Sequence, residues 1–390
     1  MLATILAGRY IPDLIALIVV CVVQSAGVLA ILNGPAARAS TLARRAILTA
    51  LAVSVAVMTM GFLLSFNRVY SHFPLWFSSW GRGLTILWAF LSVLMFTAYA
   101  ASRALPAVES THSPARRTFL LAAKTAILAG PVAAVGYGTF VQRFRLSLRE
   151  INIPIPGLPK DLDGLRVVQL TDIHLSPFLS LRELERAVDM ANETRANLAL
   201  VTGDLITTAN DPLDDCLNVL SRVRADAGVY GCMGNHEIYA DSEAYTQEQG
   251  EALGMHFLRQ QSALLRFGSA DLNLAGVDYQ RFHHPYLVGA EKLIVPGAFN
   301  VLLSHNPDVF PVAARQGFPL TISGHTHGGQ VRVEILSQDL NIARFFTHYV
   351  DGVYRKAASS IFVSRGIGTI GLPTRLGAPP EVALIRLCRT

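Results

Sequence analysis

Four long apolar runs within the first 140 residues constrain the fold of this chain more than any other feature. Each is about as long as the 20 or so residues that cross a hydrocarbon core of roughly 30 Å. Four in succession would overfill the core of a soluble domain, so residues 1–142 are expected to form an all-α transmembrane region. Three spans remain the alternative, because the fourth run is rich in Gly and Ala. The expected spans are 14–32, 46–66, 84–101 and 118–140.

The charge of the chain is divided between two regions. Residues 1–140 hold ten Lys and Arg but only two acidic residues, a balance of +8, and residues 141–390 carry a balance of −3. The second region has no basic run of the kind that lines a nucleic-acid groove, so no nucleic-acid partner is expected. The four cysteines lack CxxC spacing, which argues against a disulfide framework or a zinc–thiolate site.

An even number of spans places Met1 and the second region on the same side of the membrane. Across all connections, arginines are balanced at six against six. The first hairpin alone has Arg38, Arg44 and Arg45 in its loop against Arg9 before it. By the positive-inside tendency this loop is cytoplasmic. We therefore expect a multi-pass protein of the inner cell membrane, with the bilayer as a partner and the second region on the extracytoplasmic side.

Residues 143–163 are interpreted as a linker, because Pro154, Pro156 and Pro159 keep that segment extended. After it, apolar residues recur at helical spacing over Leu181–Asn192, between short apolar runs typical of buried strands. This alternation predicts a layered α/β domain over residues 164–390. The expected strands are Leu165–Leu170, Leu198–Val201, Val229–Met233, Leu272–Val277, Asn300–Ser304 and Leu320–Ser323.

Chemically reactive residues follow five of these strands directly. Sheets of this kind gather such residues at the carboxyl ends of their strands, so the side chains are expected to meet at one edge. A carboxylate can bridge two cations, while imidazoles and an amide oxygen complete their coordination, and no thiol is present. The sequence therefore predicts a site for two divalent ions, with Mn, Fe or Zn as the expected metals. Its residues are Asp172, His174, Asp204, Asn235, His236, His305, His325 and His327.

The ordered motifs Asp-Ile-His, Gly-Asp, Gly-Asn-His-Glu, Ser-His and Gly-His-Thr-His closely resemble those of the calcineurin-like metallophosphoesterase family. The resemblance covers roughly residues 160–390 and is closest to the bacterial membrane-associated branch, through LPKDLDGLRVVQLTDIHLSP, GHTHGGQV and SRGIGTIGLPTRLGAPPE. Glu237 stands where many members have Asp. The resemblance implies a layered β-sandwich flanked by helices.

The same resemblance assigns roles to the residues. One metal would be held by Asp172, His174 and His327, and the other by Asn235, His305 and His325. Asp204 would bridge the two ions, and His236 would face the scissile phosphate without binding metal. The implied reaction is attack of a metal-bridging hydroxide on phosphorus, with His236 assisting. Glu237 is placed in sequence to orient His236 or a metal ligand.

The expected enzyme is thus a membrane-anchored phosphohydrolase of phosphomonoester, phosphodiester or pyrophosphate bonds, with lipid-linked and envelope phosphates among its expected substrates. Candidate phosphate contacts outside the motifs are Arg365, Arg375 and Asn306. A non-catalytic membrane sensor or scaffold with a structural metal site is the alternative, although such a site has no need of His236. A transporter is disfavoured, because Lys124 is the single charge within the spans.

Overall fold

The computed structural model describes residues 11–33, 40–64, 66–70, 72–106, 113–280, 285–335 and 338–390. The chain divides into two compact units. The first contains residues 1–139 together with 371–373, and the second contains residues 140–370 and 374–390. Each unit is considered by itself below.

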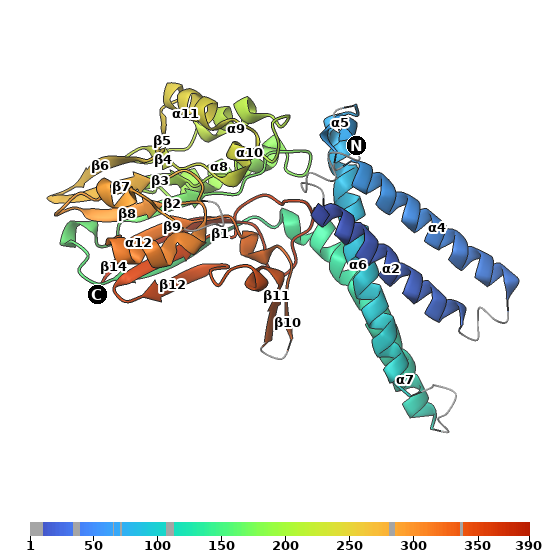
Figure 1. The fold of residues 1–390 in the computed structure, drawn as a ribbon. Helices are drawn as coiled ribbons and strands as arrows, with labels where there is room; N and C mark the ends of the chain where they lie inside the picture. The colour runs from blue at the N-terminus through green and yellow to red at the C-terminus, as the bar shows by residue number, and fades with distance from the viewer. Residues whose placement is uncertain are drawn as a thin grey trace. The chain divides into compact units, whose positions relative to one another are not determined.

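The first unit is built from helices (Figure 1). Three of those described are long and apolar enough to cross a membrane, over Thr41–Leu63, Leu75–Ala104 and Pro114–Phe144, and a shorter apolar stretch lies at Leu17–Leu32. The fourth predicted span, which the three-span alternative discounted, therefore forms a long helix that continues through Pro131. The first predicted span, 14–32, lies within the helix Ile11–Leu32. The helices are α2 (Ile11–Leu32), α4 (Thr41–Leu63), α5 (Asn67–Tyr70), α6 (Leu75–Ala104) and α7 (Pro114–Phe140).

A cluster of four polar side chains joins α2, α4 and α6. The amide of Gln24 donates to Ser92 Oγ at 2.9 Å and accepts from Ser54 Oγ at 2.8 Å. Trp88 Nε1 donates to Ser54 Oγ at 2.6 Å, and Ser92 Oγ donates to the Trp88 carbonyl at 2.7 Å. These side chains form a hydrogen-bonded clamp between the three helices, which we call the helical polar cluster.

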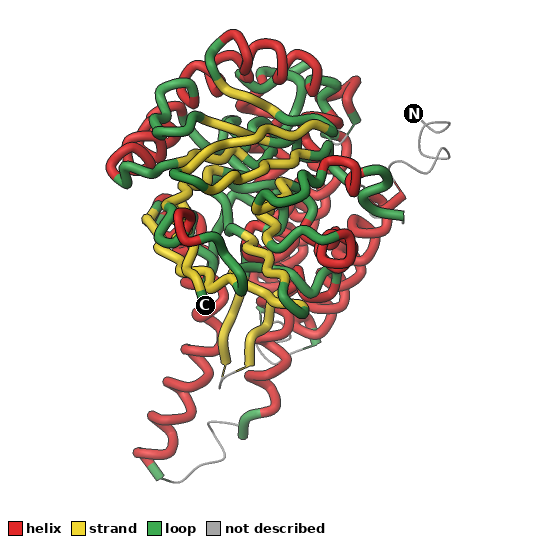
Figure 2. The backbone as a smooth tube through the Cα atoms, turned by 90° about the vertical axis from the view of Figure 1, so that its left-hand side faces the viewer, coloured by secondary structure: helices red, strands yellow, loops and turns green. Residues whose placement is uncertain are grey.

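The second unit contains two six-stranded mixed sheets and a two-stranded hairpin (Figures 1 and 2). In the first sheet the order is β1 (Ser147–Ile155), β14 (Glu381–Arg389), β2 (Arg166–Leu170), β3 (Leu198–Val201), β4 (Val229–Gly231) and β5 (Met255–Phe257). In the second sheet the order is β12 (Gly352–Lys356), β13 (Ser359–Val363), β9 (Leu320–Ser323), β8 (Phe299–Leu303), β7 (Ala270–Gly276) and β6 (Gln261–Phe267). The hairpin pairs β10 (Arg332–Ile335) with β11 (Gln338–Asn341).

The apolar faces of the two sheets pack against each other. One buried cluster draws on β1, β2, β3 and β14 of the first sheet and on β7, β8, β9 and β13 of the second. Helices α8 (Leu181–Glu193) and α9 (Leu213–Leu220) cover the other face of the first sheet, and α12 (Phe310–Gln316) packs on the second. Two further helices, α10 (Asn235–Tyr239) and α11 (Glu243–Ala252), follow β4. The prediction of a layered sandwich flanked by helices is confirmed.

The structure corrects the interpretation of residues 143–163 as a linker. Nine of these residues form β1, which pairs in parallel with β14 along its whole length. Pro154 lies within this strand, and a proline is tolerated there because β1 is at the edge of its sheet. The second unit therefore begins directly after α7.

Candidate metal centre

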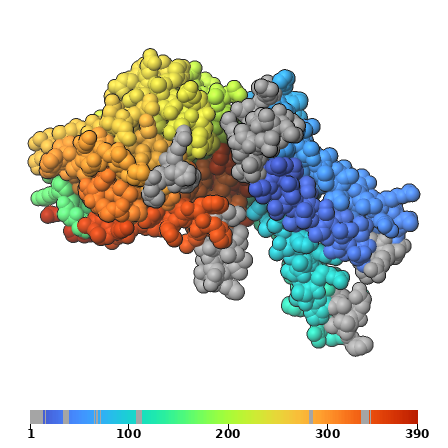
Figure 3. Space-filling model, in the orientation of Figure 1, coloured from blue at the N-terminus to red at the C-terminus, as the bar shows by residue number. Residues whose placement is uncertain are grey.

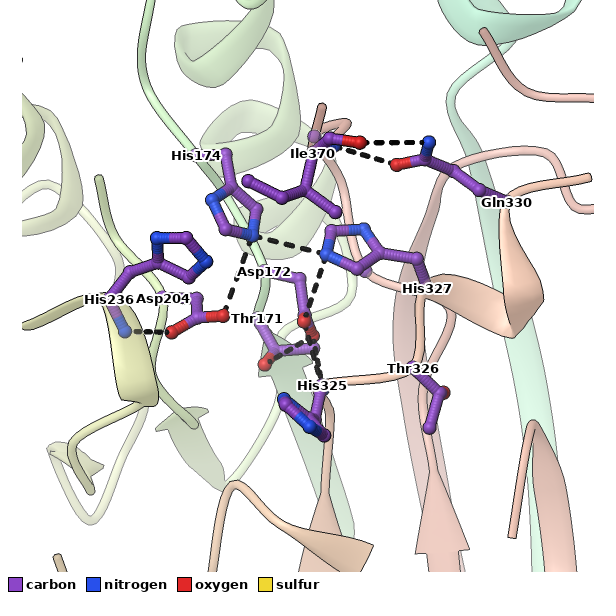
Figure 4. Close-up of polar contacts among 12 residues, drawn as sticks. Thr171, Asp172, His174, Asp204, His236, His325, Thr326, His327, Gln330 and Ile370 are labelled. Atoms are coloured by element: carbon purple, nitrogen blue, oxygen red, sulfur yellow. Dashed lines mark hydrogen bonds and ion pairs between the residues drawn. The ribbon is translucent and has the colours of Figure 1, made fainter. Parts of the chain in front are cut away.

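The predicted metal ligands lie on the turns that follow β2, β3, β4, β8 and β9. Figure 4 labels those that follow β2, β3 and β9. Five of them have a left-handed backbone, a conformation that non-glycine residues seldom adopt and that concentrates at functional sites. Their φ angles lie between 48° and 80°. The surrounding fold stabilises this backbone conformation, which directs the side chains into one space. The five residues are Asp172, His174, Asp204, His325 and His327.

Two glycines allow the turns to approach each other closely. A Cβ atom at Gly203, which has a φ of 90°, would lie 2.4 Å from the Gly234 nitrogen. A Cβ atom at Gly234 would lie 2.1 Å from Asp204 Oδ1. Neither position accepts a side chain without displacing a predicted metal ligand.

The first group of ligand atoms comes from Asp172, His174 and His327, all buried and all within 4.8 Å of one another. The Nε2 atoms of the two histidines lie 3.1 Å apart, and His327 Nε2 lies 3.4 Å from Asp172 Oδ1. The backbone N–H of His325 donates to Asp172 Oδ1 at 2.8 Å, and the Thr171 hydroxyl donates to Oδ2 at 2.9 Å. These bonds fix the carboxylate with Oδ1 toward the histidines (Figure 4).

The second group contains Asp204, His305 and His325, again with ligand atoms within 4.8 Å of one another. His305 Nδ1 lies 2.6 Å from the Thr202 carbonyl, which can only accept, so Nδ1 carries a proton and Nε2 faces Asp204 Oδ2 at 3.0 Å. Asn235 follows β4 and is also buried; its Oδ1 has no hydrogen-bond partner.

Asp204 lies between the two groups. Its Oδ2 is 3.0 Å from His305 Nε2 and 3.5 Å from His174 Nε2, so one carboxylate oxygen faces a histidine of each group. Its other oxygen, Oδ1, accepts the backbone N–H of His236 at 2.9 Å. This is the position that the resemblance assigned to a bridging ligand.

The donor set fits two cations. Buried carboxylates, imidazole nitrogens and an unpaired amide oxygen converge at one place, and each of these atoms can donate an electron pair to a divalent cation. Burial lowers the pKa of His174 and of His325 to about 3 and that of His327 well below its usual value, so these rings are neutral, as metal ligands must be.

The other two buried groups respond to each other's charge. For His305 burial opposes protonation, but the Asp204 carboxylate outweighs it and the pKa rises to about 10. Burial raises the pKa of Asp172 to about 6. In the metal-free protein a proton on His305 therefore takes the place of part of the positive charge that cations would bring.

His236 belongs to neither of these two groups, but it forms a third group with His174 and Asp204, whose ligand atoms also lie within 4.8 Å of one another. Its ring centroid is 4.7 Å from that of His174, and it is partly exposed, whereas the carboxylate ligands are buried. The ring Nδ1 lies 2.7 Å from the Thr207 carbonyl, so Nδ1 carries a proton and the Nε2 of the neutral ring bears a lone pair. Its fixed orientation suits a proton-transfer role.

Glu237 orients the backbone of the site, not the His236 ring. Its carboxylate is fully buried and accepts three backbone N–H groups. These come from Gly234 at 2.7 Å, Asp204 at 2.9 Å and Leu205 at 2.7 Å. Glu237 thus fastens the turn after β3 to the turn after β4, and with them the predicted ligands Asp204 and Asn235.

Arg375 is a positioning residue in this structure, which corrects its prediction as a phosphate contact. The side chain is fully buried. Its guanidinium donates to the backbone carbonyls of Gly368, His327 and Arg365, and Nη2 lies 3.1 Å from His327 Nδ1. Burial lowers its pKa to about 10, and the group stays charged at neutral pH. It therefore fixes the ring and backbone of a predicted metal ligand.

The other two predicted phosphate contacts also have structural partners. Arg365 Nε pairs with Asp351 at 2.9 Å, and Glu381 lies 3.8 Å away. Asn306 is fully buried; its amide donates to the Gln280 carbonyl at 2.6 Å and its Oδ1 accepts the Asp308 N–H at 2.9 Å. These contacts give both side chains a role in holding the loops around the site, and phosphate binding by either one stays a prediction.

Two residues near the site were not identified from the sequence. Thr207 contacts both His174, through its hydroxyl at 3.2 Å, and His236, through its carbonyl. The ring of Tyr279 packs 5.4 Å from that of His325 and 6.1 Å from that of His305. Neither belongs to a motif, and a tyrosine after a buried strand carries no signal that separates it from an ordinary core residue.

Comparison with known proteins agrees with this geometry. The family described as calcineurin-like phosphoesterase matches residues 165–329. Among curated proteins, the uncharacterized metallophosphoesterase YkuE of Bacillus subtilis is 28% identical over 282 residues, which cover 70% of this chain and 98% of that protein. A transmembrane protein with metallophosphoesterase domain of Danio rerio is 30% identical over 303 residues, 73% of this chain and 66% of that protein.

A third relative carries a named activity. The phosphodiesterase YaeI of Escherichia coli is 27% identical over 231 residues, which cover 57% of this chain and 82% of that protein. The aligned shares show that the chain spans about two thirds of the length of its relative from Danio rerio and nearly all of its relative from Bacillus subtilis.

Proposed function

This chain belongs to the calcineurin-like metallophosphoesterase family, and we propose that it is a membrane-anchored two-metal hydrolase of phosphate ester or pyrophosphate bonds. The observation that carries the proposal is the position of Asp204. Its carboxylate lies between two histidine groups, and the backbone of His236 is fastened to it. A structural metal site would not require His236 to be held at its edge.

When bound, two divalent cations lower the pKa of water and stabilise the negative charge that develops on the phosphoryl oxygens. The chain supplies the framework for this chemistry. Asp172, His174 and His327 would hold one ion, Asn235, His305 and His325 the other, and Asp204 both. Glu237 keeps Asp204 and Asn235 at a fixed separation through the backbone bonds described above.

His236 is the residue we assign to proton transfer. The Thr207 carbonyl holds Nδ1, so Nε2 is the atom that can exchange a proton with the leaving oxygen or contact a phosphoryl oxygen. General acid–base assistance of this kind is worth about 10²–10⁴-fold in rate. Its partial exposure allows a substrate to reach it, while the buried ligands beneath it are shielded from solvent.

The substrate class is proposed from the tether. A catalytic domain joined to membrane helices meets membrane-bound substrates at a high effective concentration, which favours a lipid-linked or envelope phosphate. The name of the Escherichia coli relative favours a diester among the three bond types. The arginine distribution of the first hairpin favours the extracytoplasmic side. Oxygen and nitrogen ligands without thiols favour Mn, Fe or Zn.

The proposal is tested on the full chain in detergent with added Mn²⁺, Fe²⁺ or Zn²⁺. We expect metal-dependent hydrolysis of bis-p-nitrophenyl phosphate and less of p-nitrophenyl phosphate, and a His236→Ala variant that loses about 10²–10⁴-fold in turnover while it still binds metal. The matched control is His256→Ala. His256 is partly exposed, contacts Glu251 and belongs to none of the motifs.

Two results would separate the alternatives. If the wild-type chain hydrolyses a lipid-linked pyrophosphate in mixed micelles but neither small ester, the proposed hydrolase activity is supported, and the bond that it cleaves is a pyrophosphate and not an ester. If none of these substrates is hydrolysed by metal-loaded protein, or if His236→Ala is as active as the wild type, the sensor or scaffold role replaces the enzyme.

A further inference from the structure

Two adjacent phenylalanines after the β10–β11 hairpin are the most exposed large apolar side chains among the described residues of the second unit. Phe345 is 87% exposed and Phe346 is 76% exposed. Arg344, immediately before them, is also exposed. We call these three residues the aromatic tip; the orange-red segment that carries it forms part of the surface of the second unit (Figure 3). Water contact at two neighbouring aromatic rings is unfavourable, and such a patch marks an interaction site.

The segment on both sides of the tip is firmly held. On one side, Asn341 donates to the Gly328 carbonyl at 3.0 Å and caps the turn by accepting the Ala343 N–H at 3.0 Å. On the other side, the Thr347 hydroxyl donates to Asp308, and the Val350 carbonyl accepts from the Thr326 hydroxyl. The exposure of the rings is thus a property of an anchored turn and not of a loose loop.

The anchors of the aromatic tip belong to the turn that carries two predicted metal ligands. Gly328 directly follows His327, and Thr326 lies between His325 and His327. A Cβ atom at Gly329 would lie 1.9 Å from Asn341 Oδ1, so the two segments are in close contact. Whatever binds the aromatic tip is therefore held next to the metal centre.

The short connection between α7 and the second unit indicates which surface the aromatic tip binds. Six residues separate the end of α7 from the start of β1, and six residues reach at most about 20 Å. If α7 crosses the membrane, the start of β1 lies within that distance of the end of the membrane helix, which keeps this end of the second unit near the lipid headgroups. Aromatic rings with a neighbouring arginine are the side chains that enter a membrane interface, where the rings meet the acyl boundary and the cation meets lipid phosphate.

We propose that the aromatic tip inserts into the bilayer surface and forms a second membrane contact, besides the helices, that holds the metal centre at the lipid interface. The proposal deepens the proposed function, because it places the site where a lipid-linked phosphate is presented. It rests on the membrane location but not on turnover.

The test is a depth measurement on the full chain in proteoliposomes of phosphatidylcholine and phosphatidylglycerol. Cys21 and Cys388, which are partly exposed, are replaced by Ser, and the two fully buried cysteines remain. A nitroxide is attached at Phe345→Cys or, separately, at Phe346→Cys. The matched control is Leu264→Cys, an apolar side chain on β6 that is 56% exposed.

We expect oxygen to relax the nitroxide at 345 and 346 more strongly than a water-soluble nickel chelate does, and the reverse at 264. In the protein labelled at 345, Arg344→Glu is expected to reduce the depth in the anionic vesicles and to have less effect in phosphatidylcholine alone. Two positions are labelled independently, and an unchanged thermal transition shows that each variant is folded.

Nickel relaxation at 345 and 346 equal to that at 264 would overturn the proposal, even if the protein hydrolyses phosphoesters. Deep labels in a protein without hydrolysis would support the aromatic tip and count against the proposed enzyme. The two proposals can therefore fail separately.

Discussion

The two units of this chain each contain a cluster of polar side chains, and the clusters differ in whether each polar atom has a hydrogen-bond partner. In the helical polar cluster, Gln24, Ser54, Trp88 and Ser92 donate to and accept from one another. In the candidate metal centre, carboxylates and imidazoles converge while Asn235 Oδ1 has no hydrogen-bond partner. Leaving such an atom buried and unpaired costs about 1–3 kcal/mol.

This difference distinguishes a cluster that holds helices together, in the first unit, from a site that binds a ligand, in the second. A closed set of hydrogen bonds stabilises helix packing and needs nothing further. An open set is unstable by itself, and the fold adds to its cost through the left-handed backbone at five ligands. The interactions of these atoms with a bound group offset that free-energy cost. The predictions below test this contrast, beginning with the change expected to have the greatest effect.

Asp204→Asn removes the negative charge that lies between the two histidine groups while it retains the size of the side chain. We expect hydrolysis to fall to the metal-free background and the bound metal to fall from two ions to one or none, because the second cation loses its shared carboxylate. Metal content by mass spectrometry and turnover are the readouts. Asp278→Asn is the matched control, since Asp278 pairs with Arg259. Two bound ions and normal turnover in Asp204→Asn would contradict the assignment.

Arg375→Lys keeps a positive charge but loses the planar fork that holds His327 and three backbone carbonyls. Support of this kind around a metal ligand is worth about 10–100-fold in affinity, so we expect Mn²⁺ to bind more weakly by that factor. Arg365→Lys, at an ion pair that is partly exposed, should change the affinity much less. Equal loss in both variants would show that the effect does not depend on the contacts of Arg375 with His327, and would contradict its positioning role.

Metal binding is expected to strengthen as the pH rises from 7 toward 10. The His305 pKa is raised to about 10 in the metal-free protein, so its proton must leave when a cation binds, whereas His174 and His325, with pKa values near 3, have none to lose. Calorimetry at pH 7.5 in two buffers of different ionisation enthalpy should detect about one proton released. Binding that releases no proton would show that the His305 pKa lies below the experimental pH.

The same raised pKa sets the stability of the metal-free protein. A histidine whose pKa rises on folding stabilises the native state fully below its unfolded value near 6.5 and loses that contribution as the pH rises to 10. Metal-free protein should therefore become less heat-stable over this interval. The metal-loaded protein should not follow the same curve, because its His305 is already deprotonated.

Gln24→Leu opens the helical polar cluster and should have the smallest effect. Hydrogen bonds between membrane helices average about 0.6 kcal/mol, so a small decrease in the unfolding midpoint in detergent is expected, with metal affinity unchanged. Thr97→Val is the control, because the Thr97 hydroxyl bonds only to the Val93 carbonyl of its own helix among the contacts described. A loss of metal binding in Gln24→Leu would contradict the separation of roles between the two clusters.

Much of the fold follows from local sequence patterns. The strands Leu198–Val201 and Leu320–Ser323 have the predicted bounds, and the motif residues follow strand ends as expected. The pairing of β14 between β1 and β2 was not predictable, because it joins segments more than 200 residues apart and depends on packing rather than on periodicity. Pro154 within β1, with Pro156 and Pro159 just after it, also concealed a strand that the edge of the sheet tolerates.

The candidate site was predictable in its residues but not in its supports. The predicted metal ligands belong to motifs whose residue types, order and spacing can be recognised in the sequence. The positioning role of Arg375 could not be recognised in this way, because a fully buried arginine is rare and a residue in a Gly- and Pro-rich segment is more often at the surface. The three backbone bonds of Glu237 likewise depend on two turns that only the tertiary fold brings together.

The most direct test of the account is to locate the metal ions in crystals of the full chain grown with Mn²⁺, by anomalous diffraction. The account predicts two peaks about 3.5–4 Å apart, both within coordination distance of the Asp204 carboxylate. One would contact Asp172, His174 and His327, and the other Asn235, His305 and His325. A single peak, or two peaks that Asp204 does not join, would contradict the two-metal site on which the proposed hydrolysis depends.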